Sequence, residues 1–500
     1  MILCLIALSG VTLALTGIIS SIGITLNQSL ALVSSISILT VWFYDKFKSV
    51  TLGLILFISK PFWVRLAFVF DHGQSGSGGF DLLGIMPAVL FSLLIILQIY
   101  SNLAGGKRIC RDRTRTIFMV FTGLSFTSIF FPSNSITIGL GGFERNILPN
   151  MMILFLLADI VNEKAQILIL IKTMLIIGII SLIYGIGQYF AGIYPWEIDW
   201  FQQIAFKDSL GAWLTIGLRG IEFRLFSIFY SYMDFFFTNI LIYALIIAFN
   251  NSFDGIWRKL RTIYLILFYI VLILSLERMP LVMALIVTIV LNYLGCSARK
   301  KRKIVWLGII SGGVIYSSLL LATPLLNSTG AAKLVRLAEL ANPFKASSIN
   351  DRVQTKWGPA LETIKSNPFG VGIGYGSQTK ASRQAEESNN YVKPHNELIQ
   401  KALETGFVGG VLYLLLLICL FKDFKIISKF EDIGRLFGCA MIAATISFWT
   451  CGLVNLPFSG TSGLLYWAFA GVALAIKDRH VSDWNMPKYY DEISDNKVGL

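Results

Sequence analysis

Residues 350–410 read NDRVQTKWGPALETIKSNPFGVGIGYGSQTKASRQAEESNNYVKPHNELIQKALETGFVGG, the most polar stretch of an otherwise apolar chain. A charge-free apolar run, residues 407–421, overlaps its end and continues beyond it. A polar segment leading into such a run is typical of a loop that returns into a lipid bilayer as a helix. The stretch therefore predicts membrane-spanning helices on both sides of one large extramembrane loop.

The composition of the 500 residues favours an all-α polytopic membrane protein. Hydrophobic residues make up 55% of the chain and charged residues 14%, and the mean hydropathy is +0.69. The apolar runs are continuous, whereas the strands of a transmembrane β-barrel would alternate. The net charge is +13, but the basic residues cluster in short loops between apolar runs. That pattern indicates membrane orientation, so no nucleic-acid partner is expected.

The apolar runs predict about twelve to fourteen membrane-spanning helices, since a span needs about 20 residues. They are two runs within residues 1–44, then 49–70, 82–100, 116–131, 147–161, 165–190, 226–249, 262–276, 279–295, 304–323, 405–421, 436–455 and 463–476. A polar loop is expected from 132 to 146, and a connection at the membrane–water interface from 191 to 225. The chain thus divides into an N-terminal transmembrane bundle (1–323), a large extracytoplasmic loop (324–404), and C-terminal transmembrane helices with a cytoplasmic tail (405–500).

Lys and Arg are concentrated in alternate loops, and this asymmetry predicts the orientation. The rich set comprises residues 45–48, 107–115, 162–164, 251–261, 296–303 and 422–435 and the C-terminal tail. By the positive-inside rule both termini are cytoplasmic and the large loop lies outside. No basic region precedes the first apolar run, so we expect a retained span and not a cleaved signal peptide.

The outer face then collects a set of residues suited to an anionic group: Arg219, Arg224, Arg278, Arg352 and His395. Arginine presents a planar fork of N–H donors that matches phosphate oxygens, so the set favours a lipid headgroup or a diphosphate. Alternatives remain for three of them. Arg278 lies at a short junction between two spans, where it either binds such a group, pairs with Glu277 or reaches the interface. Arg219 and Arg224 lie near the start of a span. Reaching the interface is an alternative for Arg224 and the preferred interpretation for Arg219.

His395 lies where the large loop re-enters the membrane. Pro394 fits the start of a helix there. An imidazole titrates near neutrality and can accept a proton from a sugar hydroxyl, so His395 is a candidate general base. Asn396 and Glu397 follow directly and are predicted to orient the ring or tune its pKa. The alternative is that His395 only caps the helix.

Alternating glycines, at 370, 372, 374 and 376, form a further motif. A dinucleotide-binding loop would need a βαβ unit, and a potassium filter would need a pore helix. Close packing of the loop backbone against helices or a ligand is the preferred interpretation. The six cysteines show no CxxC pair or metal-ligand spacing, and the outer face carries no His pair. No metal and no other cofactor are therefore expected.

The segments DRVQTKWGPALETIKSNPFGVGIGYG and KPHNELIQKALETGFVGGVLYLLLL resemble the O-antigen polymerase/ligase family (Wzy and WaaL types). In that family an Arg…Trp…Asn-Pro-x-Gly-x-Gly-x-Gly stretch precedes His-Asn-x-x-Leu and Glu-x-Gly-x-x-Gly. The matching positions are Arg352, Trp357, Asn367, Pro368, His395, Asn396, Leu398, Glu404, Gly406 and Gly409. Two weaker matches lie upstream. RLFSIF, from Arg224, resembles the family's Arg-x-x-Gly-x-Phe with Ser227 in place of Gly, and SLER, ending at Arg278, resembles its Ser-x-x-Arg turn.

The resemblance implies a GT-C-like membrane glycosyltransferase at the outer face of the bacterial inner membrane. Its substrates would be undecaprenyl-diphosphate-linked oligosaccharides, as donor and acceptor, with a chain-length regulator and a flippase as further partners. The family's histidine, here His395, is proposed to activate the acceptor hydroxyl. Its arginines, here Arg224, Arg278 and Arg352 with Arg219 in support, are proposed to hold the donor diphosphate.

Three functions are compatible with these observations. The chain length and number of spans favour a repeat-unit polymerase. A ligase that transfers finished glycan to lipid A core is the nearest alternative. A lipid-linked oligosaccharide transporter is the third, and would place charged residues near the membrane midplane; Lys60, Arg65 and Lys172 lie inside predicted spans. Residues 331–340 and 354–364 have helical apolar spacing and are expected to form short helices of the large loop, capping an amphipathic cavity.

Overall fold

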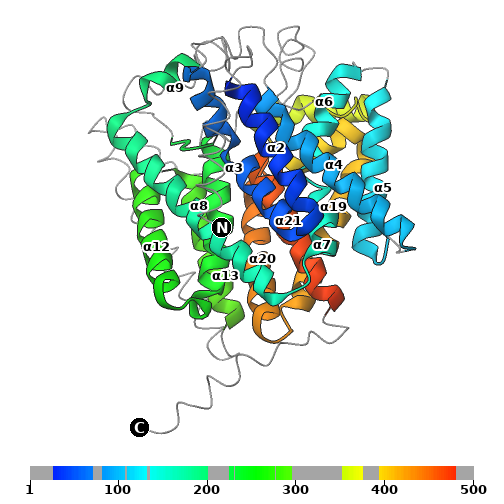
Figure 1. The fold of residues 1–500 in the computed structure, drawn as a ribbon. Helices are drawn as coiled ribbons and strands as arrows, with labels where there is room; N and C mark the ends of the chain where they lie inside the picture. The colour runs from blue at the N-terminus through cyan, green and yellow to red at the C-terminus, as the bar shows by residue number, and fades with distance from the viewer. Residues whose placement is uncertain are drawn as a thin grey trace.

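The computed structural model describes residues 26–70, 82–106, 110–131, 136–200, 225–229, 231–275, 277–295, 352–375 and 394–479, and all regular elements in these ranges are helices. The N-terminal half contains α2 (Leu26–Tyr44), α3 (Lys46–Phe70), α4 (Leu82–Ala104), α5 (Arg113–Thr127), η1 (Ser128–Phe130), α6 (Ile136–Asn146), α7 (Ile153–Ile160), α8 (Lys164–Ala191), α9 (Pro195–Trp200) and α11 (Tyr232–Ala248). The C-terminal half contains η3 (Asn250–Ser252), α12 (Gly255–Ser275), α13 (Arg278–Gly295), η5 (Arg352–Trp357), α17 (Gly358–Ser366), α19 (Glu397–Ile427), α20 (Asp432–Gly452) and α21 (Gly460–Arg479). Figure 1 shows these helices packed side by side in one bundle.

The fold is that of a polytopic membrane protein, as predicted. Five described helices are long and apolar enough to cross a bilayer: Lys46–Ala67, Met86–Ala104, Lys164–Ala191, Glu397–Ile427 and Asp432–Gly452. Three shorter apolar helices accompany them: Gln28–Tyr44, Tyr232–Ala248 and Met279–Gly295. The predicted span at 304–323, and most of the first of the two expected within 1–44, lie outside the described residues.

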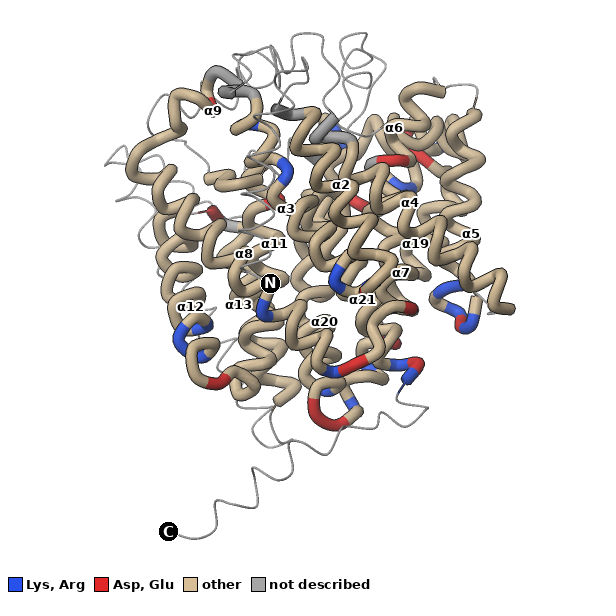
Figure 2. The backbone as a smooth tube through the Cα atoms, in the orientation of Figure 1, with Lys and Arg blue, Asp and Glu red and all other residues tan. Residues whose placement is uncertain are grey.

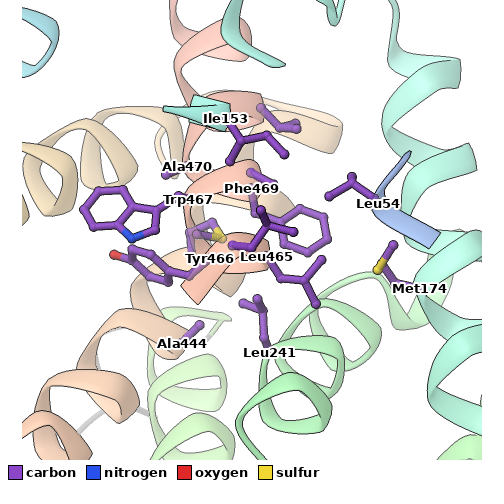
Figure 3. Close-up of a cluster of buried hydrophobic side chains, with 14 of the residues drawn as sticks. Leu54, Ile153, Met174, Leu241, Ala444, Leu465, Tyr466, Trp467, Phe469 and Ala470 are labelled. Atoms are coloured by element: carbon purple, nitrogen blue, oxygen red, sulfur yellow. The ribbon is translucent and has the colours of Figure 1, made fainter. Parts of the chain in front are cut away.

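Helix α21 forms the centre of the bundle. Its residues from Thr461 to Ile476 are all buried, and Trp467 is among the largest fully enclosed side chains. Figure 3 shows its side chains surrounded by residues of several other helices, among them Ile153 of α7, Leu241 of α11 and Ala444 of α20. A helix enclosed on every side must be apolar all round, which explains why α21 has no polar face.

Positive charge gathers at one end of the bundle. Figure 2 shows Lys and Arg concentrated where α12 and α20 begin and near the start of α5. Part of this charge is paired: Arg115 of α5 contacts Asp478 at 2.7 Å, and Lys477 contacts Asp423 at 2.7 Å. These pairs join α5, α19 and α21. This end carries the loops that the sequence predicts to be cytoplasmic.

Three elements differ from the prediction. The expected span at 147–161 contains only the eight-residue helix α7, which is too short to cross a bilayer on its own. The expected polar loop at 132–146 contains the helix α6. The expected span at 405–421 lies inside α19, which begins earlier, at Glu397. The charged residues of its first turns suggested exposure, but they face the protein interior and not lipid. Charged side chains inside a membrane are tolerated in that position when they have partners.

Candidate functional site

The start of α19 places His395, the predicted base, immediately outside a capped helix. Asn396 is the N-cap: its side chain accepts a hydrogen bond from the N–H of Ile399 (3.0 Å) and donates one to the carbonyl of Leu453 (3.0 Å). Capping by a short amide side chain is the usual way to satisfy the first N–H groups of a helix. Because Asn396 has this function, the alternative that His395 is the cap is wrong.

The backbone of His395 has an unusual conformation. Its φ is 50°, in the left-handed region, and its side chain is partly exposed. Such a conformation is uncommon for a residue other than glycine and is often associated with functional sites. Asn396 and Glu397, predicted to support the histidine, are both buried, at 6% and 3% exposure.

Behind His395, α19 carries a buried row of polar side chains facing the bundle: Glu397, Gln400, Lys401 and Glu404. Lys401 Nζ lies 3.8 Å from Glu404 Oε2, and Gln400 Nε2 donates to Glu404 Oε1 (3.3 Å). The hydroxyl of Tyr413 donates to Glu397 Oε1 (3.4 Å). Buried charges are costly unless paired and hydrogen-bonded, so this row is a built feature of the site. Of these residues, Glu397 was predicted from the sequence, Glu404 was matched only through the family motif, and Lys401 was not predicted.

The alternating glycines dock onto a kink in α19. The kink is at Gly406, where φ is 80°. Around it the N–H of Phe407 donates to the carbonyl of Pro368 (3.0 Å), and the N–H of Gly372 donates to the carbonyl of Glu404 (3.0 Å). A Cβ on Gly370 would lie 2.4 Å from the nitrogen of Gly406, closer than any side chain allows. The preferred interpretation of the glycines, close packing of backbone against a helix, is confirmed.

Helix α6 covers the other side of the glycine segment. A Cβ on Gly142 would lie 2.2 Å from Cα of Gly374, and one on Gly374 would lie 2.3 Å from the carbonyl oxygen of Ile138. The N–H of Gly374 also donates to Glu404 Oε1 (3.3 Å). The segment is therefore held between α6 and α19.

Arg352 lies at the start of a short helical unit that leads to the glycine segment. Residues Arg352–Trp357 form a turn of π-helix, η5, and α17 follows without a break and packs against α19. Turns of π-helix are rare and often occur at functional sites. The predicted short helix at 354–364 is confirmed, whereas the one at 331–340 lies outside the described residues. Arg352 is thus connected to α19 through η5 and α17, and His395 directly precedes the N-cap of α19.

Arg278 is the first residue of α13, directly after the α12–α13 turn, in which the N–H of Glu277 donates to Ser275 Oγ (3.4 Å). The side chains of Arg278 and Arg352 are outside the description, as are Arg219 and Arg224 entirely. The convergence of the arginines stays a prediction. No group of three or more possible metal ligands occurs in the ranges that the structure covers, and metal independence also stays a prediction.

The fold and this site define a multi-pass helical membrane protein with a motif-bearing polar loop docked on a kinked helix. Residues 263–414 match the model of the O-antigen ligase family. The match begins within α12 and ends within α19, just after its kink, so it includes α13, η5, α17 and the glycine segment but not α6. The resemblance drawn from the motifs is confirmed by this match, which supports a function of the O-antigen polymerase/ligase type. No curated protein matches the chain.

Proposed function

We propose that the protein is a repeat-unit polymerase at the outer face of the bacterial inner membrane. It transfers a growing glycan from undecaprenyl diphosphate to a hydroxyl of a second lipid-linked unit. The observation that carries this proposal is the docking of residues 352–375 on α19, which begins directly after His395, within the region matched by the family. This arrangement brings a candidate base and a candidate anion-binding segment to the same helix.

The proposed reaction is a single displacement. His395 accepts the proton of the acceptor hydroxyl, and the oxygen attacks the anomeric carbon of the donor sugar. The bond between that carbon and the diphosphate oxygen breaks, and undecaprenyl diphosphate leaves with the bonding electrons. Arg224, Arg278 and Arg352, supported by Arg219, stabilise the charge on the leaving group without a metal. Attack from the face opposite to the leaving group inverts the anomeric configuration.

The arginine assignment can be tested on the purified protein. Replacing Arg278 or Arg352 with Ala is expected to weaken use of the lipid-linked donor. Arg278→Lys should restore activity only in part, because an ammonium group keeps the charge but loses the fork that contacts two phosphate oxygens. Full activity of Arg278→Lys would contradict the assignment.

A ligase is the second candidate, favoured by the description of the matching family. The two activities differ in what accumulates when the gene is deleted. Loss of a polymerase leaves single repeats attached to lipid A core. Loss of a ligase leaves bare core and lipid-linked polymer. Analysis of the surface glycan in a deletion strain therefore separates them.

The transporter alternative is less well supported, because the charged residues inside the helices have partners within the protein. Lys60 Nζ lies 4.6 Å from the centre of the Phe57 ring, and its charge also acts on Asp234, which accepts N–H groups at the start of α21. Lys172 Nζ lies 5.1 Å from the Trp257 ring. Lys60, which the sequence left without a role, therefore has an aromatic and an electrostatic partner inside the bundle. These contacts do not require a transported ion.

A further inference from the structure

Arg65 is a charged residue in a membrane-spanning helix, α3, and its guanidinium group is enclosed by protein. Its side chain is 1% exposed. Nε donates to the carbonyl of Pro61 (3.0 Å), Nη2 donates to the carbonyl of Ser227 (2.9 Å), and Nη1 lies 2.9 Å from Glu197 Oε1. The group also stacks at 5.2 Å from the centre of the Phe226 ring. An arginine held in this way would have to give up these contacts to reach a substrate, so its role lies within the protein.

Glu197 of α9 balances the charge of Arg65 and extends the network to α8. It is fully buried. Gln188 Nε2 donates to Glu197 Oε2 (3.0 Å), and the hydroxyl of Tyr184 donates to Oε1 (3.0 Å). The network thus joins α3, α8 and α9 near the end of the bundle where α9 lies (Figure 1). A buried ion pair with this many hydrogen bonds specifies one arrangement of the helices, because any other arrangement would leave a buried charge without its partner.

The network converges on Ser227. The N–H of Ser227 donates to Gln188 Oε1 (2.8 Å), its hydroxyl donates to the carbonyl of Ser181 (2.5 Å), and its carbonyl accepts from Arg65. Its φ is 53°, and it stands where the related family stretch has a glycine. A left-handed conformation at a residue other than glycine persists only where its surroundings impose it. Here the network supplies a partner for each polar atom of Ser227.

Ser227 lies in the buried segment 225–229, where Leu225 and Phe229 are at most 1% exposed. Arg224, a proposed donor-binding residue, is bonded to Leu225. A displacement of this segment therefore moves the backbone from which the arginine extends. A binding group needs support of this kind, because a shift of about 1 Å is enough to weaken a site.

We infer that Arg65, Glu197 and Gln188 form a positioning cluster for the donor-binding arginine segment. They act through Ser227 and the backbone that leads to Arg224, and not by contact with the substrate. This inference rests on the proposed function, since it takes Arg224 as a residue that holds the donor diphosphate.

The test is binding of undecaprenyl diphosphate to the purified full-length protein in lipid nanodiscs, comparing the variants Arg65→Gln, Gln188→Met and Arg224→Ala with the wild type. Arg65→Gln is expected to raise the Kd about 10-fold, the lower end of the effect of lost supporting partners at other binding sites. Gln188→Met removes the bonds to Ser227 and to Glu197 without removing a charge, and its effect should be smaller but in the same direction. If Arg65→Gln does not fold, the Kd of Gln188→Met alone tests the inference.

The matched control is Arg115→Gln. Arg115 is as deeply buried as Arg65 and is paired with Asp478, but at the opposite end of the bundle. It should cost comparable stability and leave the Kd unchanged. If the cluster acts through Arg224, adding Arg65→Gln to Arg224→Ala should weaken binding no further, because coupled residues are not additive.

The outcomes separate the inference from the proposed function. Wild-type binding by Arg65→Gln and Gln188→Met, beside weak binding by Arg224→Ala, overturns the positioning cluster and leaves the donor assignment intact. Additive losses in the double variant, or an equal loss in Arg115→Gln, overturn it as well. Absence of binding by the wild type, or wild-type binding by Arg224→Ala, overturns the donor assignment and the inference together.

Discussion

At the scale of single residues, His395 and Asn396 have separate roles at the start of α19. Asn396 caps the helix and bonds to Leu453, whereas His395 stands one residue before the cap in a left-handed conformation. Replacing His395 should therefore affect chemistry more than folding. This separation makes the predicted base directly testable.

His395→Asn is expected to reduce glycan transfer about 10²–10⁴-fold, the usual contribution of a general base. Protein level, melting temperature and donor binding should stay near those of the wild type, because the amide removes the proton acceptor and keeps a polar group of moderate size. Transfer by the purified variant is the measurement. A rate near that of the wild type would exclude the role as base.

The Lys401–Glu404 pair allows a second test at this scale, one of stability. Lys401→Met leaves the carboxylate of Glu404 buried without its cation, and we expect a loss of about 3–5 kcal/mol in the free energy of unfolding. The double variant Lys401→Met with Glu404→Gln removes both charges and should recover part of that loss. Chemical denaturation in detergent measures both. Equal losses in the two variants would show that the charges do not act as a pair.

At the scale of elements, the glycine segment depends on close backbone contact with α6 and with the kink of α19. Gly142→Ala would place a methyl group against Gly374, and we expect it to destabilise the protein by about 1–3 kcal/mol, as overpacking does elsewhere. Gly123→Ala in α5 is the control, because nothing lies within 4 Å of its added methyl group. It should be neutral, or stabilising by about 0.5–1 kcal/mol. Identical melting curves for the two variants would argue against the packing role.

The same elements show which features the sequence could predict. Long apolar runs gave the spans, and Pro394 with a polar loop before it placed the start of a helix near His395. The alternating glycines indicated close packing, but not the partner. That partner, α6, lies more than 200 positions earlier in the chain, and a single sequence carries no signal of a contact over such a separation. The sequence did not indicate the pairing of Arg65 with Glu197 for the same reason. The charged residues at 397–404 were predicted to lie in a solvent-exposed loop, because their burial depends on the surrounding helices.

At the scale of the whole molecule, a cluster of charged residues lies at the end of the bundle opposite α6 and α9. Asp112 caps α5 and accepts bonds from the N–H of Arg115 (2.8 Å), from Arg115 Nη1 (3.0 Å) and from Lys477 Nζ (3.1 Å). Burial would raise the pKa of Asp112. The N–H of Arg115 and the charges of Arg115 and Lys477 outweigh it and hold the pKa below the ordinary value of 3.8.

The lowered pKa of Asp112 predicts the direction of a pH effect. A carboxyl group with a depressed folded-state pKa stabilises the protein fully above its ordinary value, and that contribution is lost as the pH falls below 3.8. Asp112→Asn keeps an N-cap but not the charge. We expect its melting temperature to be lower than that of the wild type at pH 6 and the difference to shrink toward pH 3. A constant difference across this range would contradict the prediction.

The orientation of the molecule can be decided with the exposed Cys110, which lies in the basic loop between α4 and α5. If the positive-inside rule holds here, this loop is cytoplasmic. In a Cys296→Ser background, which removes the cysteine of the cytoplasmic loop 296–303, a membrane-impermeant maleimide should then label Cys110 in inside-out vesicles but not in intact spheroplasts. Adding Cys110→Ser should abolish this labelling. Ser366 of α17 is exposed and lies in the large loop, so Ser366→Cys in the Cys110→Ser background should be labelled in spheroplasts. Labelling of Cys110 from outside would place the large loop, with His395 and Arg352, in the cytoplasm. Undecaprenyl-diphosphate-linked repeats are expected at the outer face, so the proposed polymerase would then lack access to its substrate.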